Sequence, residues 1–191
     1  MSSLLDLPED LPCPVDDGAC DHLTGMQMPH IRLASTAGRD VDIGALGSGW
    51  TILYCYPRTG RPGEALPAGW DAIPGARGCT PEACAFRDHA AELEALGARV
   101  FGLSTQTTQY QREMATRLHL PFEVLSDADL TFATALRLPT FEVDGMRLIK
   151  RLTLIIRNGM IEHVFYPVFP PDESAAGVVC WLRGRATGAR P

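Results

Sequence analysis

The sequence lacks the features that would place this protein in a membrane or on nucleic acid. No apolar run approaches the roughly 20 residues that a transmembrane helix needs. The formal net charge of −6 leaves no basic footprint for nucleic acid or for an anionic membrane. Met1 to Pro12 carry acids and prolines rather than a basic segment followed by an apolar one, so we expect no signal peptide. These absences predict a protein without membrane or nucleic-acid partners.

Regular cysteine spacing is also absent. The 191 residues include six cysteines, and their irregular spacing in a chain of this length is unlike a secreted disulfide framework. A reducing cytoplasm with reversible thiol chemistry is the simpler interpretation. The hydrophobic content of 46% suits one domain over residues 1–191, and no internal repeat or linker is visible. We expect residues 1–27, rich in Pro, Asp and Gly, to be a loosely held arm, and residues 184–191 to be a frayed tail.

Residues 75–88 carry two cysteines, Cys79 and Cys84, where a helix is expected to begin. Thr80 is a good N-cap, and Pro81 suits the first turn, where a proline loses no hydrogen bond. Apolar residues then recur at helical spacing as far as Leu96, and Gly97 supplies a stop. The pattern therefore predicts Cys79 at the start of a helix and Cys84 inside it.

This placement predicts thiol chemistry. Unpaired N–H groups and the helix dipole favour a thiolate at Cys79, and Arg77 and Arg87 act in the same direction if they face the sulfur. Two helical residues five positions apart have Cα atoms about 8.6 Å apart. A disulfide tolerates only about 4.4–6.8 Å. The pair can bond only if the first turn unwinds, which indicates a redox cycle rather than a structural staple.

The segment 78–88, Gly-Cys-Thr-Pro-Glu-Ala-Cys-Ala-Phe-Arg-Asp, closely resembles the active-site helix of the peroxiredoxins. It is most similar to the branch called bacterioferritin comigratory protein, or Q-type thiol peroxidases, and the likeness covers roughly residues 28–183. The resemblance implies that Cys79 attacks a peroxide, that Cys84 resolves the sulfenic acid as an intramolecular disulfide, and that a thioredoxin- or glutaredoxin-like donor reduces it. It implies no cofactor or metal, and a monomer.

The order of predicted elements gives the fold class. Strands are expected at 28–35, 50–56, 99–104, 122–125, 148–157 and 160–166, with a second short element at 41–46. Helices are expected after residue 79, after Thr107 or Thr108, at 127–136 and at 172–183, and Asn158-Gly159 is a strong hairpin signal. This order predicts an α/β protein with a mixed central sheet and helices on both faces. It matches the thioredoxin-like fold that the resemblance implies.

The resemblance also implies further site residues, with one departure. The family pattern is Pro-x-x-x-Thr/Ser-x-x-Cys, but here Ala76 stands three before Cys79, and Pro57 stands 22 before it. Thr59 is the best candidate for the displaced threonine, with residues 60–76 as an inserted loop before the active-site helix. Thr80 is a competitor. Pro57 and Gly78 are expected at the substrate, and the insertion is either a lid shaped by Trp70 or a surface ornament.

Arg151 lies 72 residues after Cys79, before an apolar run that leads to the hairpin. The peroxiredoxins carry an arginine on the equivalent strand, and a cation that cannot deprotonate would hold the thiolate and the departing oxygen. Lys150 and Arg157 are competitors for this role.

Other functions remain open on the residues alone. The chain could be a zinc-binding or redox-sensing thiol module that uses Cys13, Cys20, Cys79 and Cys84, although zinc knuckles usually show shorter spacing. A thioredoxin-type disulfide oxidoreductase would use Cys-x2-Cys rather than the four-residue gap found here. The displaced threonine also allows a catalytically silent relative.

Overall fold

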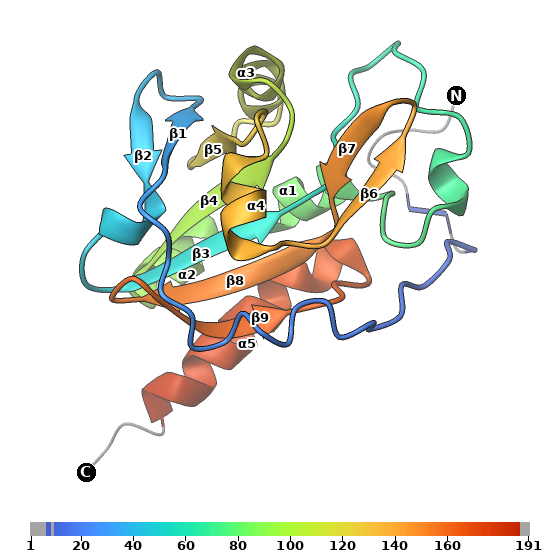
Figure 1. Cartoon of the computed structure of the whole chain (residues 1–191). Coiled ribbons are helices and arrows are strands. Elements are labelled where there is room, and N and C mark those ends of the chain that lie inside the picture. Colours follow the sequence, from blue (N-terminus) through green and yellow to red (C-terminus); the bar gives the residue numbers. More distant parts are fainter. Residues whose placement is uncertain (1–6, 9, 188–191) are drawn as a thin grey trace.

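A mixed β-sheet forms the centre of the molecule, in a computed structural model that describes residues 7, 8 and 10–187 (Figure 1). Within these residues the sheet has seven strands in the order β2-β1-β5-β4-β3-β8-β9. Strands β3, β4 and β5 are parallel, and the other neighbours are antiparallel. The strands are β1 (Arg32–Ser35), β2 (Asp40–Asp42), β3 (Trp50–Cys55), β4 (Ala98–Ser104), β5 (Glu123–Ser126), β8 (Leu152–Arg157) and β9 (Met160–Phe165). The predicted mixed α/β sheet is therefore confirmed.

Strand β3 divides its side chains between two cores, as a strand buried on both faces should. Ile52 and Tyr54 lie in one cluster, and Leu53 and Cys55 lie in the other. Cys55 is completely buried, which agrees with an inert core thiol. Strand β3 is paired on one side with β4 and on the other with β8. Its carboxyl end consequently opens beside the segment that carries the predicted site.

Helices cover both faces of the sheet. Helices α1 (Cys79–Asp88), α2 (Ala90–Ala95), α3 (Thr108–Arg117) and α5 (Ser174–Thr187) contribute to the core that contains Tyr54. Helix α4 (Thr131–Leu136) packs on the opposite face. Short 3-10 helices are η1 (Ile43–Ala45), η2 (Trp70–Ala72) and η3 (Pro171–Glu173). Of the helices in the described ranges, none is long and apolar enough to cross a membrane.

Two predicted elements are divided in the structure, and one strand was not predicted. The expected single strand 148–157 is two strands, β7 (Met146–Ile149) and β8, separated at Lys150 and Arg151. Strand β7 pairs with β6 (Thr140–Val143), which the sequence analysis missed, in a separate hairpin. The helix expected to run from Cys79 to Leu96 breaks at His89, whose ring and backbone N–H both contact the Ala85 carbonyl oxygen. Gly97, with φ 75°, ends α2 as expected.

From Asp17 onward, the N-terminal arm packs against the body of the molecule, unlike the loosely held arm expected from composition. Leu23 is completely buried, and Cys20 joins the same core. Asp17 bonds to the Lys150 ammonium at 2.7 Å and to the Tyr166 hydroxyl at 2.8 Å. The blue segment in Figure 1 runs along β9, where Gln27 forms a bridge with Met160. At the other end, α5 continues to Thr187, and the rest of the expected frayed tail lies outside the described residues.

The inserted loop 60–76 packs against the β6–β7 hairpin instead of lying free on the surface. Trp70 is 4% exposed, and its ring centroid lies 6.2 Å from that of Phe141. Together with Ala76 and Leu148, Trp70 forms a third hydrophobic cluster. A buried tryptophan in a cluster of this kind fixes the loop, because its large apolar surface is removed from water. The insertion is thus an ordered segment that packs against the β6–β7 hairpin, next to the predicted site.

Candidate active site

Cys79 is the first residue of α1 and is 3% exposed. The N-cap is Gly78, with φ 99°, and not Thr80 as the sequence predicted. A Cβ at Gly78 would lie 2.3 Å from Pro171 Cγ, so the position needs both positive φ and the absence of a side chain. This packing against η3 accounts for the glycine. Thr80 is instead buried within the first turn.

Arg151 lies beside the Cys79 sulfur. Its Nη2 is 3.1 Å from Cys79 Sγ, and the same nitrogen donates to the carbonyl oxygens of Arg77 at 3.0 Å and Ala76 at 3.3 Å. Its Nη1 donates to a carboxylate oxygen of Glu82. The break between β7 and β8 places Arg151 inward, whereas its competitor Lys150 bonds to Asp17 and Arg157 stacks over Trp50. Of the three predicted cations, the structure therefore brings only Arg151 to Cys79.

Glu82 is the acidic residue of this cluster and is completely buried. It lies three residues after Cys79, so both side chains are on the same side of α1. Burial raises the pKa of Glu82 to about 7, and the Arg151 guanidinium opposes that rise. Glu82 was not among the candidate site residues identified from the sequence. The three-residue spacing was the signal that could have placed it at the site.

The electrostatics of Cys79 differ from the expectation. Burial raises the pKa of the Cys79 thiol, the Arg151 cation opposes the rise, and the Glu82 charge adds to it. The Arg58 backbone also acts to lower the pKa of this thiol. Arg77 pairs with Asp71 at 3.1 Å. Arg87 pairs with Asp88 and acts on the pKa of Cys84 instead. Arg151 is therefore the main group that favours a thiolate.

Thr59 is 1% exposed and is held by Gln106. The Thr59 N–H and hydroxyl donate to Gln106 Oε1 at 3.0 and 3.1 Å, and Gln106 Nε2 donates to the Thr59 carbonyl oxygen at 3.1 Å. Pro57 is buried just before them, after β3. The hydroxyl hydrogen thus points to Gln106, and the oxygen lone pairs are left to accept another donor. Sequence reasoning missed Gln106, because 47 residues separate it from Thr59.

Cys84 is half-buried one turn further along α1, and its thiol is free. Burial raises the pKa of Cys84, and Arg87 opposes the rise. Because both cysteines lie in regular helix, their Cα atoms are about 8.6 Å apart, beyond disulfide reach. As expected from the sequence, Cys79 and Cys84 can form a disulfide only if the first turn of α1 unwinds.

The other predicted cysteines do not join this site. Cys13 is exposed, and Cys20 lies in the core on the other face of the sheet, where burial raises its pKa to about 12. In the described part of the chain, no group of three or more histidine, cysteine, aspartate or glutamate side chains is placed to hold a metal ion. The structure thus does not assemble the zinc-binding set of Cys13, Cys20, Cys79 and Cys84.

Comparisons with known proteins agree with this arrangement. The model of the Redoxin family matches residues 23–179. Peroxiredoxin Q from the chloroplast of Oryza sativa subsp. japonica is 25% identical over 149 residues, or 78% of this chain. A putative peroxiredoxin bcp of Coxiella burnetii is 31% identical over 107 residues, or 56% of this chain. In each case the match covers 61% of the relative's length.

Solved structures show the same fold. The crystal structure of peroxidoxin BcpB from Mycobacterium tuberculosis superposes with a TM-score of 0.70 at 26% identity, over 89% of this chain and 100% of that one. A mutant PrxQ of Xylella fastidiosa also gives a TM-score of 0.70, at 20% identity over 86% and 98% of the two chains. The fold is accordingly thioredoxin-like, as the sequence predicted. The chain belongs to the redoxin family, in its peroxiredoxin Q and bcp branch.

Proposed function

We propose that this protein is a thiol-dependent peroxidase that reduces hydrogen peroxide and organic hydroperoxides. The observation that carries the proposal is the Arg151 guanidinium 3.1 Å from the sulfur of Cys79, at the start of a helix. A permanent cation and the helix N-terminus both stabilise negative charge on that sulfur. The relatives support the assignment because their names identify them as peroxiredoxins.

The first step is nucleophilic attack on the peroxide. The Cys79 thiolate attacks one peroxide oxygen, the O–O bond breaks, and the other oxygen leaves with a proton as water or alcohol. Cys79 is oxidised to a sulfenic acid, and the peroxide is reduced. Arg151 stabilises the thiolate and the developing charge on oxygen. The Thr59 oxygen accepts the hydroperoxide O–H, while Pro57 and Gly78 form the wall that keeps water from the sulfur.

The second step regenerates the thiol. The Cys84 S–H condenses with the Cys79 sulfenic acid, which forms the S–S bond and releases water. A thioredoxin- or glutaredoxin-like dithiol then reduces this disulfide and is itself oxidised. Both cysteines belong to one chain, so a monomer completes the cycle. Sulfur carries the electrons, and the cycle uses no metal or organic cofactor.

The test is peroxide turnover coupled to thioredoxin, its reductase and NADPH. We expect turnover by the wild type, none by Cys79→Ser, and wild-type turnover by Cys180→Ser, because Cys180 is an exposed cysteine on α5. Mass spectrometry after one equivalent of peroxide should show Cys79 linked to Cys84. Wild-type turnover by Cys79→Ser would refute the assigned nucleophile, and linkage to Cys13 or Cys20 would refute the assigned resolving residue.

A further inference from the structure

A cavity of about 360 Å³ lies next to the predicted site and has no part in the chemistry above. Three segments that follow parallel strands line it: Arg58 after β3, residues 105–107 after β4, and Ala128 with Leu130 after β5. The carboxyl ends of parallel strands are the usual place for ligand sites in α/β proteins. Its volume is in the range of small-molecule sites. We call it the Arg58 cavity; Tyr110 of α3 and residues 146–148 of β7 complete it.

Two arginines give the Arg58 cavity a positive charge. Arg58 lies with its guanidinium 5.6 Å from the centre of the Tyr110 ring and 3.9 Å from Met146 Sδ. Arg147 donates from Nε to Thr140 Oγ1 at 3.1 Å. Neither guanidinium takes part in an ion pair among the described residues, and Glu142, the cross-strand neighbour of Arg147, is not within ion-pair distance. Two cations lining one cavity without an acidic partner favour an anionic ligand.

Glu64, the acid that contacts Tyr110, is already engaged, and α3 adds to the positive charge. Glu64 accepts a hydrogen bond from the Tyr110 hydroxyl at 3.1 Å and forms an ion pair with Arg61 at 3.6 Å. Helix α3 begins at Thr108, with the Thr107 side chain accepting from Tyr110 N, so the N-terminus of the helix borders the cavity. A helix N-terminus favours a bound anion. The charge of the cavity is therefore not compensated from this side.

The remaining wall is apolar. Leu130, Met146 and Leu148 line it, and Leu148 is 2% exposed. A ligand that satisfies both parts of the cavity carries one anionic head and a short hydrocarbon tail. The head would take charge-assisted hydrogen bonds from the arginines, and the tail would cover the apolar wall.

The cavity is in contact with the predicted active site through two of its lining residues. The Arg58 backbone acts to lower the pKa of the Cys79 thiol, while the Arg58 side chain lines the cavity. Gln106 lines the cavity and holds both the backbone and the hydroxyl of Thr59. A ligand in the cavity would thus contact Gln106, which holds Thr59, and Arg58, whose backbone influences the Cys79 thiol.

We propose that the Arg58 cavity binds a small monocarboxylate with a short apolar tail, held by Arg58 and Arg147. The site goes beyond the peroxidase reaction, which needs only the hydroperoxide group and the sulfur. Binding does not depend on thiol chemistry, so it can be measured in a protein that cannot react with peroxide.

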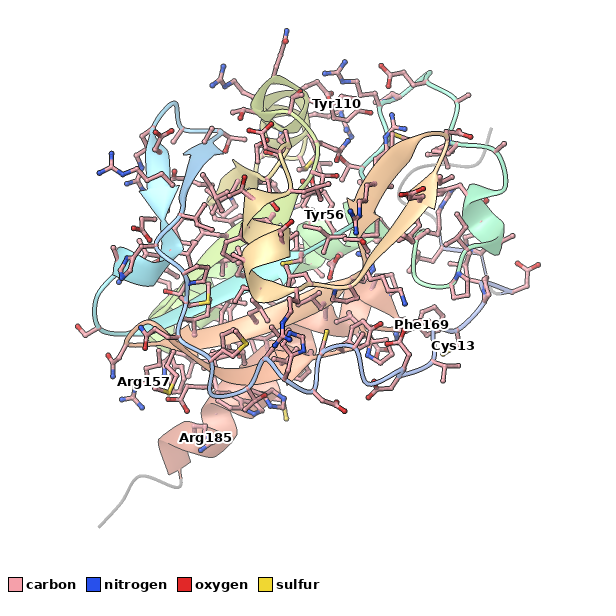
Figure 2. The ribbon with its side chains drawn as sticks, in the orientation of Figure 1. Cys13, Tyr56, Tyr110, Arg157, Phe169 and Arg185 are labelled. Carbon is pink, nitrogen blue, oxygen red and sulfur yellow. The ribbon has the colours of Figure 1, made fainter. Side chains whose placement is uncertain are left out.

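The experiment is calorimetric titration of octanoate into the Cys79→Ser protein at low ionic strength. We expect one saturable site. The affinity for uncharged 1-octanol should be lower than that for octanoate by about tenfold or more. Arg58→Gln and Arg147→Gln should each lower the affinity for octanoate about tenfold. The matched control is Arg157→Gln, which removes an exposed arginine over Trp50. Figure 2 shows Arg157 at the opposite end of the molecule from Tyr110, and this variant should bind as Cys79→Ser does.

Three results would overturn the proposal: no saturable heat at millimolar octanoate, equal affinity for octanoate and octanol, or equal loss in Arg157→Gln. The second would show a purely apolar cavity, and the third a general charge effect. Each leaves the peroxidase assignment untouched. Conversely, absence of peroxide turnover by the wild type would refute the peroxidase assignment, and the octanoate titration would still test the cavity proposal.

Discussion

Arg151 donates to a sulfur, a carboxylate and two carbonyl groups at once, which only a planar guanidinium can do. Replacing it with lysine keeps one charge but loses the fork of donors. We expect Arg151→Lys to lower kcat/KM for hydrogen peroxide about 100-fold. It should also raise the pH at which Cys79 becomes reactive to iodoacetamide. Arg157→Lys, at an exposed arginine, is the control and should behave as wild type in both measurements. Wild-type rates in both variants would exclude Arg151 from the reaction.

Glu82 competes with the sulfur for the same guanidinium. Its negative charge raises the pKa of Cys79, so Glu82→Gln should lower that pKa while the amide keeps a hydrogen bond to Arg151. The measurement is the pH midpoint of Cys79 alkylation, which should move to lower pH. Glu94→Gln, at an exposed glutamate of α2, should leave the midpoint unchanged. A midpoint that stays or rises in Glu82→Gln would contradict the shared-cation arrangement.

The same carboxyl makes stability depend on pH. Its pKa is raised from 4.5 to about 7 in the folded protein, so the folded state holds the proton more tightly than the unfolded state. The resulting stabilisation is fully present below pH 4.5 and is lost as the pH rises through about 7. The free energy of unfolding of wild type, measured in urea relative to Glu82→Gln, should therefore fall across this window. A difference that is flat or rises with pH would place the Glu82 pKa elsewhere.

The sequence could identify the residues of the site that carry motif information. Cys79 and Cys84 stand in an eleven-residue pattern, and Arg151 precedes an apolar strand. The position of Gln106 could not be predicted, because it meets Thr59 only after β3 and β4 have paired. The raised pKa of Cys79 was also not predictable, because burial outweighs the helix start and depends on the packing of η3 and the insertion.

At the scale of elements, the first turn of α1 is the part that must move. Gly78 packs on Pro171, and Arg151 holds the two carbonyl groups just before it, so the turn is fixed while Cys79 is reduced. Forming the Cys79–Cys84 bond must break this turn. We expect hydrogen–deuterium exchange of residues 79–86 to increase after one equivalent of peroxide in the wild type. The increase should be absent in Cys84→Ser, whose α1 stays helical. Equal protection before and after oxidation would exclude unwinding.

The break between β7 and β8 shows the limit of reading elements from apolar runs. Residues 148–157 alternate well enough to predict one strand, yet the chain turns at Lys150 and Arg151 so that Arg151 enters the core. The need to pair a buried guanidinium with Glu82 and Cys79 overrides local strand propensity. Strand β6 was missed because it is only four residues long and half-buried, and its partner had been assigned to the longer strand.

At the scale of the whole molecule, segments without helix or strand periodicity contribute residues to the hydrophobic cores. The N-terminal arm and the insertion show no helix or strand pattern, yet Leu23 and Trp70 are buried in two different clusters. Their irregular backbone follows the surface left by the sheet and the β6–β7 hairpin, so burial there depends on tertiary contacts. Composition alone therefore predicted a loose arm where the chain contributes to the core.

The arm supplies a direct measure of this contribution. Leu23 is completely buried, whereas Val15, eight positions earlier, is 82% exposed. Leu23→Ala should lower the free energy of unfolding by about 2–5 kcal/mol, because it removes buried methyl groups and leaves a cavity. Val15→Ala should change it by less than about 0.5 kcal/mol. Urea denaturation followed by tryptophan fluorescence gives both values. If the two variants were equally stable, the arm would pack against the core without contributing to the stability of the fold.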